Sequence, residues 1–417
     1  MKLMLFRTKS IYLEWLICLC YVGLLFPTKI SNITLILLCV FSLFCFNLKQ
    51  FKETWGTGLF LRIIFVYFII HVIGLLYTED LKAGLFILEK KIGLLLLPLL
   101  LLPALGGLYP VNLKTLLIKL GIITLLSSLV VLLIALFRSI ALKDTQAFFF
   151  ENFSPIHYVY YAIYFAIGSL IFLDATFYYF QKKKYGLLIW FILAAYSTGM
   201  LIIISSKMGI IAFVMGAAFL IYFRTPNKKY FFSASVILIT SLSLFISIHD
   251  TTRQRFLDLG KNFEILKEDQ IIYNAGEEFT GFNLRVLFWK FSLSHLWEEN
   301  EYLIGVGTGD AQHFIDEAYT LHNLSVYDYK GWDPHNQWVF MTIQFGVIGV
   351  LVLVLFYLNG FWIAFCKRDI RLVCFLLVTL CFSMTESILE SNKGIVFFAL
   401  FSVILFSPYS VHPKKTT

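Results

Sequence analysis

The chain is poor in charged residues. Of its 417 residues, 14% are Asp, Glu, Lys or Arg, whereas a soluble domain carries about 25%. Apolar stretches of about 20 residues recur along almost the whole length, and 59% of all residues are hydrophobic. This composition excludes a soluble globular protein and predicts an all-α polytopic membrane protein.

Metal-ligand spacings and disulfide frameworks are also missing. The seven cysteines all lie in or beside apolar segments, and no CxxC pair occurs among them. We therefore expect no disulfide, no zinc site or other metal, and no cofactor. Internal repeats and Pro- or Gly-rich linkers are absent from the sequence too, which favours one membrane domain with a single insertion.

Twelve apolar segments are candidate membrane spans, which predicts about twelve transmembrane helices and one large loop. The first segment contains Glu14 and is followed by no small-x-small cleavage site, so we expect an uncleaved span. The twelve segments are Ile11–Phe26, Ile30–Phe46, Gly58–Tyr77, Ile92–Leu108, Thr115–Phe137, His157–Phe180, Gly186–Ile204, Met208–Phe223, Tyr230–Ile248, Asn336–Trp362, Leu372–Leu389 and Gly394–Phe406.

The distribution of charge predicts the orientation. With the N-terminus in the cytoplasm, the inside segments hold seventeen Lys or Arg residues and two acidic residues. The loop His249–Pro334 then lies outside, with fifteen acidic residues against seven basic ones. The net charge of +8 thus follows from a positive-inside pattern and does not point to nucleic acid. We expect cytoplasmic termini, a membrane domain over 1–248, an external cap over 249–335 and a second membrane region over 336–417.

The long external loop is expected to fold. It contains Trp289, Trp297, Trp332 and many Phe and Tyr residues, in which disordered segments are poor. Apolar residues recur at helical spacing over Phe282–Trp297. This pattern predicts an amphipathic helix that lies on the membrane body.

A titratable pair, His335-Asn336, stands where this loop meets the next predicted span. A histidine titrates near neutral pH and can take a proton from an attacking hydroxyl group, which makes His335 a candidate catalytic base. The alternative is a solvated loop histidine, with Asn336 or Asp333 capping the following helix.

Two cations are candidates for binding phosphate. Arg285 lies on the predicted amphipathic helix and could hold a diphosphate with its guanidinium fork, although an ion-paired surface arginine is the alternative. Ser206-Lys207 lies between two apolar runs. A lysine in the middle of a bilayer costs about 2.5–3.5 kcal/mol, so we expect a hairpin tip at the outer interface, on the same side as the long loop.

The stretch Gly305-Val306-Gly307-Thr308-Gly309 is rich in glycine. Its spacing is G-x-G-x-G without a surrounding strand–helix unit, which disfavours a nucleotide-binding loop. Gly305 and Gly307 are interpreted as a tight turn that brings the backbone close to a ligand, and a plain turn is the alternative.

Two further groups of charges are less specific. Glu386 and Glu390 are four residues apart near the end of the predicted eleventh span, so we expect them on one helix face. There they would orient the histidine or an acceptor, or pair with Lys393. The stretch Lys82–Lys91 has helical periodicity, and its charged face is expected to be solvated, with contact to lipid phosphates as the alternative.

Taken in this order, these residues resemble the O-antigen ligase/polymerase superfamily of bacterial envelope glycosyltransferases. The family pattern places a small-residue-plus-arginine motif between two spans, then a long periplasmic loop with an arginine and a G-x-G-x-G turn, then a His-Asn pair before a span with a G-x-x-G patch. The resemblance covers roughly residues 150–400 and departs at Lys207, where the family has arginine. The matching residues are Ser206-Lys207, Arg285, Gly305, Gly307, Gly309, His335-Asn336 and Gly346-Val347-Ile348-Gly349.

The resemblance implies a GT-C-like fold and a metal-independent glycan transfer from undecaprenyl diphosphate at the periplasmic face of the bacterial inner membrane. Arg285 and Lys207 would hold the diphosphate, and His335 would deprotonate or orient the acceptor hydroxyl. A ligase that acts on lipid A–core is the first hypothesis. A polymerase of the same superfamily, with a glycan acceptor, stays open, as does a transporter or flippase from another class. The expected substrate-binding residues are Asn336, Glu386, Ser206, Gly305 and Gly307.

Overall fold

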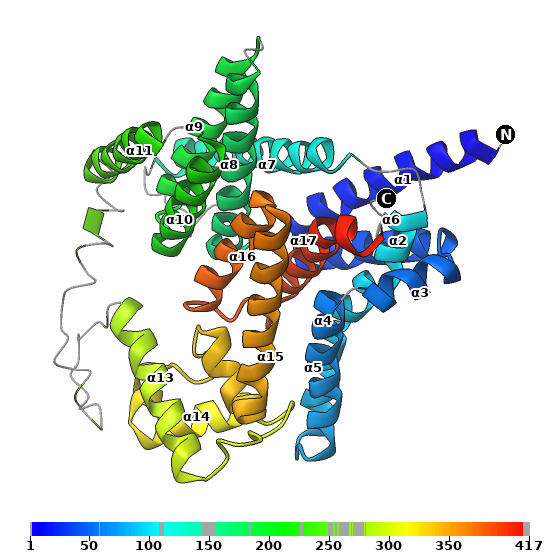
Figure 1. Ribbon diagram of the computed structural model, residues 1–417. Coiled ribbons are helices and arrows are strands. Elements are labelled where there is room, and N and C mark those ends of the chain that lie inside the picture. Colours follow the sequence, from blue (N-terminus) through cyan, green and yellow to red (C-terminus); the bar gives the residue numbers. More distant parts are fainter. Residues whose placement is uncertain are drawn as a thin grey trace.

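The computed structural model is helical wherever it assigns regular structure within residues 2–57, 59–107, 112–143, 156–182, 185–225, 228–248 and 281–411, the ranges that it describes together with single positions between 253 and 279 (Figure 1). The all-α prediction is confirmed over these ranges. The elements are α1 (Lys2–Leu24), α2 (Thr28–Phe44), α3 (Leu48–Thr57), α4 (Leu59–Ile73), η1 (Gly74–Leu76), α5 (Leu81–Leu96), η2 (Leu97–Leu101), α6 (Leu102–Gly107), α7 (Leu113–Leu142), α8 (Tyr158–Gln181), α9 (Leu187–Ile203), α10 (Lys207–Arg224), α11 (Lys228–Ile248), α13 (Gly281–Glu298), α14 (Ala311–Leu321), η6 (Leu324–Tyr327), α15 (Gln337–Lys367), α16 (Ile370–Ser383) and α17 (Asn392–Val411).

Four of the described helices are long and apolar enough to cross a membrane. They are α7, α8, α10 and α15, and six shorter apolar helices accompany them in the described residues. The helix α8 is the most enclosed of the four, with 78% of its apolar window buried, so it lies inside the bundle instead of facing lipid. This architecture is consistent with a polytopic membrane protein, and the count of twelve spans stays a prediction.

The longest helix, α15, is interrupted at Gly346 (φ 57°, ψ −145°). Around the break, the amide of Val347 donates to the carbonyl of Tyr302 at 3.0 Å. In the other direction, the amides of Val306 and Gly307 donate to carbonyls of α15 at 2.9 and 3.0 Å. A Cβ atom at Gly346 would lie 2.3 Å from a backbone carbon of Leu303, so only glycine fits there. The segment 302–307 is therefore joined to α15 through main-chain hydrogen bonds.

The helices α13 and α14 lie at one end of the bundle, beside the start of α15 (Figure 1). Leu287 and Phe291 on α13 and Ile315 on α14 are buried in a second hydrophobic cluster together with Val339 and Ile343 on α15. The helix predicted over Phe282–Trp297 is confirmed as α13, and its apolar side is the core of this cap. The predicted cap residues 249–280 lie almost entirely outside the described residues.

At two of the predicted spans the helix end lies elsewhere, and in each case a polar side chain fixes that helix end. The fourth predicted span begins at Ile92, whereas α5 begins at Leu81, where the carboxylate of Asp80 accepts a hydrogen bond from the amide of Ala83 at 2.8 Å. Lys91 therefore lies within α5 and not before it.

The eleventh predicted span ends at Leu389, whereas α16 ends at Ser383. The residues that follow form a turn, because Gln337 at the start of α15 accepts a hydrogen bond from the amide of Leu389 at 2.7 Å. Glu386 and Glu390 thus lie in this turn and do not share a helix face.

Candidate functional site

His335 lies immediately before α15, in the left-handed backbone conformation (φ 48°). Asn336 caps the helix, since its Oδ1 accepts hydrogen bonds from the amides of Trp338 and Val339 at 2.9 and 3.3 Å. On the other side, the indole Nε1 of Trp289 donates to the carbonyl of Pro334 at 2.7 Å. The backbone is thereby fixed on both sides of His335. The structure confirms that Asn336 caps the following helix.

The carboxylate of Glu386 joins His335 to Arg285. Its Oε2 lies 3.1 Å from His335 Nδ1, and its Oε1 accepts a hydrogen bond from Arg285 Nη2 at 2.6 Å. Asp333 Oδ1 lies 3.4 Å from the same Nδ1. The side chain of Glu386 is only 13% exposed, so these charges interact where water screens them weakly. We call Arg285, Asp333, His335 and Glu386 the histidine cluster.

The two carboxylates change the titration of the histidine. Burial alone would lower the pKa of His335, but the hydrogen bond to Glu386 and the charges of Asp333 and Glu386 outweigh burial and raise it above the ordinary 6.5. Burial would also raise the pKa of Glu386, but the hydrogen bond from His335 and the Arg285 charge lower it. Burial raises the pKa of Asp333. Glu386 is therefore ionised at neutral pH, while His335 keeps its proton to a higher pH than a free histidine.

Arg285 is held in one orientation by three described partners. Its Nε donates to the carbonyl of Thr385 at 3.2 Å, its Nη1 to the carbonyl of Gly281 at 2.9 Å, and its Nη2 to Glu386. A guanidinium group has five N–H donors. Two donors remain beyond these three bonds, which is the number needed to bind an anion with two parallel hydrogen bonds.

A cavity of about 540 Å³ adjoins the histidine cluster, which is in the size range of small-molecule sites. Its charged lining residues are Lys207, Arg285 and Glu386. The other lining residues, which are mostly apolar or small, are Tyr158, Val159, Ser205, Ser206, Met208, Ile211, Gly281, Phe282, Phe382 and Thr385. The cavity therefore combines a cationic wall with an apolar wall.

Lys207 is the first residue of α10. Ser206 caps this helix, since its Oγ accepts a hydrogen bond from the amide of Gly209 at 3.2 Å. The predicted hairpin tip is confirmed as a turn between α9 and α10. Because the positive end of a helix dipole lies at its N-terminus, the cavity receives this partial charge in addition to the ammonium group.

Gly305 and Gly307 are not brought to the cavity. Both have positive φ, of 71° and 97°. A Cβ atom at Gly305 would lie 2.4 Å from the backbone carbonyl carbon of Gln344, and one at Gly307 would lie 3.0 Å from the carbonyl oxygen of Gly74. The backbone comes close to the protein's own helices there, and neither glycine is among the residues that line the cavity.

A buried ion pair that the sequence analysis missed holds the turn that carries Glu386. Lys91 is 1% exposed, and its Nζ donates to Glu390 Oε1 and to the carbonyl of Leu389, both at 2.7 Å. Gln337 Nε2 donates to the same Glu390 oxygen at 3.0 Å. The prediction of a solvated face is therefore wrong for Lys91. Glu390 pairs with Lys91 instead of Lys393, whose ammonium group donates to the carbonyls of Gly23 and Phe26.

We expect Lys91→Met to destabilise the protein by about 3–5 kcal/mol, because it leaves the Glu390 carboxylate buried without its cation. Thermal unfolding of the detergent-solubilised full chain, followed by tryptophan fluorescence, measures the loss. Lys90→Met is the matched control, since Lys90 lies next in the chain but is not fully buried. The double variant K91M/E390Q should recover part of the loss. Equal unfolding temperatures for K91M and K90M would contradict the assignment.

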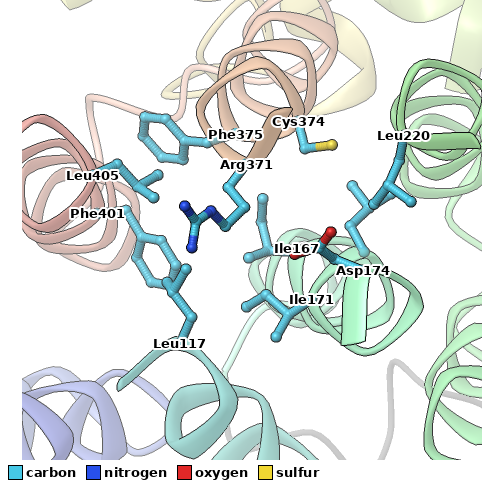
Figure 2. Close-up of a pocket in the computed structure, with 11 residues that line it drawn as sticks. Leu117, Ile167, Ile171, Asp174, Leu220, Arg371, Cys374, Phe375, Phe401 and Leu405 are labelled. Carbon is cyan, nitrogen blue, oxygen red and sulfur yellow. The ribbon is translucent and has the colours of Figure 1, made fainter. Parts of the chain in front are cut away.

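A second cavity lies near the start of α16 and is bordered by α7, α8, α10 and α17 (Figure 2). Its volume is about 20 Å³, room for one or two water molecules. Arg371 points into it among Phe375, Phe401 and Ile167. Arg371 and Phe375 lie twelve and eight residues before α16 ends at Ser383, so this cavity lies about 12–18 Å along the helix from the start of the turn with Glu386. It is too small for a sugar or a diphosphate.

The fold and the site together define a helical membrane protein with a capped cavity that carries two cations beside a carboxylate–histidine pair. Residues 192–354 match the family model described as Wzy_C, O-antigen ligase. The resemblance to the O-antigen ligase/polymerase superfamily is thereby confirmed, and the members of this family are glycosyltransferase-like enzymes that act on lipid-linked glycans. The match runs from α9 into α15 and contains Lys207, Arg285 and His335, whereas Glu386 lies beyond it. No curated protein matches the chain.

Proposed function

We propose that the protein is an O-antigen ligase-type glycosyltransferase. It moves a glycan from undecaprenyl diphosphate to lipid A–core at the periplasmic face of the inner membrane. The observation that carries this proposal is the junction of the cavity and the histidine cluster, where Glu386 binds Arg285 with one oxygen and His335 with the other. This junction supports a diphosphate site next to a base.

The cavity provides for both halves of a lipid-linked donor. Lys207 and the two remaining donors of Arg285 bind the diphosphate, and Ser206 lies beside them. Val159 and Ile211 belong to the apolar wall, which suits the first isoprene units of the carrier. Lysine acts here as a point charge, so the fork geometry comes from Arg285 alone.

In the proposed step, the acceptor hydroxyl oxygen attacks the anomeric carbon of the donor sugar. The bond between this carbon and the diphosphate oxygen breaks, and the diphosphate leaves with the electron pair, which Arg285 and Lys207 stabilise. The hydroxyl proton passes to Nε2 of neutral His335, because Nδ1 is directed at Glu386. Glu386 then stabilises the imidazolium that forms.

The test is deletion of the gene followed by gel electrophoresis of the lipopolysaccharide. A ligase predicts core without attached glycan, together with accumulation of the lipid-linked polymer. Core that bears a single repeat unit would instead identify a polymerase of the same superfamily. Core without attached glycan, with the lipid-linked glycan accumulating on the cytoplasmic side of the membrane, would replace both with a flippase.

The raised pKa of His335 predicts the pH dependence of transfer. The base must be neutral to accept a proton. We therefore expect kcat/KM to rise with pH, with an inflection above pH 6.5, and transfer to be lost at pH values below that inflection. Glu386→Gln removes the hydrogen-bonded charge that raises this pKa, and we expect the inflection to move to lower pH. Glu317→Gln, at an exposed carboxylate on α14, should leave the profile unchanged. An inflection that stays in place in E386Q would show that another group titrates.

A further inference from the structure

Trp332 is a partly exposed aromatic ring beside the candidate base. Its side chain is 45% exposed. Its ring centroid lies 5.9 Å from that of His335, with the planes at 70°, and Tyr329 contacts it edge-on with centroids 5.5 Å apart. The ring of His335 also lies nearly parallel to that of Phe288, with centroids 6.5 Å apart. The indole thus contacts Tyr329 and His335 while nearly half of Trp332 is exposed.

Trp332 contacts His335 but does not line the cavity. The cavity is lined by Lys207, Arg285 and Glu386, whereas neither Trp332 nor Asp333 belongs to its lining. His335 contacts the cavity-lining Glu386 through Nδ1 and Trp332 through its ring. A transfer reaction needs the acceptor hydroxyl next to the base, and Trp332 is a partly exposed ring that contacts His335 outside the cavity lining.

The chemistry around Trp332 suits a sugar. A sugar ring has faces of C–H groups that stack on an aromatic ring, and a rim of hydroxyl groups that donate hydrogen bonds to carboxylates. Asp333 supplies a carboxylate that is 31% exposed and directly follows Trp332 in the chain. We infer that Trp332, backed by Tyr329 and flanked by Asp333, is the subsite for the sugar ring of the acceptor that carries the attacking hydroxyl. This inference rests on the proposed function and deepens it.

A second exposed tryptophan in the cap serves as the matched control. An exposed tryptophan in the cap could otherwise be an anchor at a membrane interface, where tryptophan is enriched. Trp297 is 68% exposed and stacks on Tyr302 with centroids 4.6 Å apart. It lies twelve residues along α13 from Arg285, about 18 Å at 1.5 Å per residue. An anchoring role predicts similar effects at both positions, whereas a sugar subsite predicts an effect at Trp332 alone.

The experiment measures initial rates of transfer by the purified full chain in detergent, with undecaprenyl-diphosphate-linked glycan as donor and lipid A–core as acceptor. Trp332→Ala should raise the KM for the acceptor about tenfold, which corresponds to about 1.4 kcal/mol. The KM for the donor and the kcat at saturating acceptor should stay unchanged. Trp332→Phe keeps a ring to stack on and should stay within about twofold of the wild type. Trp297→Ala should behave as the wild type.

The outcomes separate the inference from the proposed function. An unchanged acceptor KM in W332A, an equal rise in the donor KM, or the same rise in W297A would each overturn the sugar subsite while transfer itself persists. If W332A does not fold, Trp332→Leu keeps the apolar bulk without the ring and should show the same rise in acceptor KM. Absence of any transfer by the wild type would instead reject the proposed function, and the subsite with it.

Discussion

Replacing His335 with asparagine is expected to reduce kcat by about 10²- to 10⁴-fold, the range supplied by general base catalysis. Asparagine cannot accept the proton at neutral pH, but it tolerates the left-handed conformation that His335 adopts at φ 48°. The substitution therefore removes the chemistry with little strain in the backbone. Rates of transfer from undecaprenyl-diphosphate-linked glycan to lipid A–core measure the loss, and the KM for the donor should change little.

His313→Asn is the control for this variant, because His313 is exposed on α14 and belongs to the same cap. It should transfer as the wild type does. Wild-type kcat in H335N, with the fold intact by tryptophan fluorescence, would mean that the acceptor hydroxyl needs no base at this position. His335 would then be reduced to a residue that orients the acceptor.

Arg285→Ala is expected to lower kcat/KM for the donor by about 10²- to 10³-fold, the cost of removing one preorganised donor group at a developing negative charge. Arg285→Lys should recover only part of this loss. An ammonium group keeps the charge, but it cannot bind Gly281, Thr385 and Glu386 and still present two parallel donors to a phosphate. The same transfer assay measures both variants.

Lys290→Ala controls for the loss of a cation from α13, since Lys290 lies five residues further along this helix and pairs with Asp269. It should leave the donor KM unchanged. A full recovery of activity in R285K would show that a positive charge alone is needed at this position. The two parallel N–H donors of the guanidinium group would then not be required for binding the diphosphate. A loss in K290A as large as in R285A would assign the effect to the net charge of the cap.

The sequence predicted the site residues that differ in chemical type from their surroundings. His335, Arg285 and Lys207 stand out because a polar group beside an apolar run is costly and must be explained by a partner or a ligand. The helix α13 was predictable for a similar reason, since helical periodicity within a polar loop is a strong local pattern. These inferences needed only the residue type and its neighbours in the chain.

The contacts that assemble the site were not predictable in this way. Glu386 meets His335 across 51 positions, and Lys91 meets Glu390 across 299. A lysine that ends the pair Lys90-Lys91 looks the same in the sequence whether it is solvated or buried. The end of α16 was placed too late, because the amide of Leu389 leaves the helical pattern to bind Gln337, a tertiary contact that no local propensity contains.

For the glycine motif, the sequence predicted the backbone conformation but not the group that it contacts. The G-x-G-x-G pattern identified correctly that the backbone must come close to another group, as the positive φ values of Gly305 and Gly307 require. The pattern carries no information about what that group is. In the structure it is the protein's own main chain at Gln344 and Gly74, so a motif that is typical of ligand loops here joins two helices.

The break at Gly346 in turn limits how the cap can move. Main-chain hydrogen bonds run in both directions between α15 and the segment 302–307, and no side chain could fit at the glycine. Breaking several such bonds at once is costly, so we expect the segment 302–307 and α15 to move as one unit. Neither of them lines the cavity, so any opening that admits a substrate must come from the other elements around it, such as α8, α10 and α13.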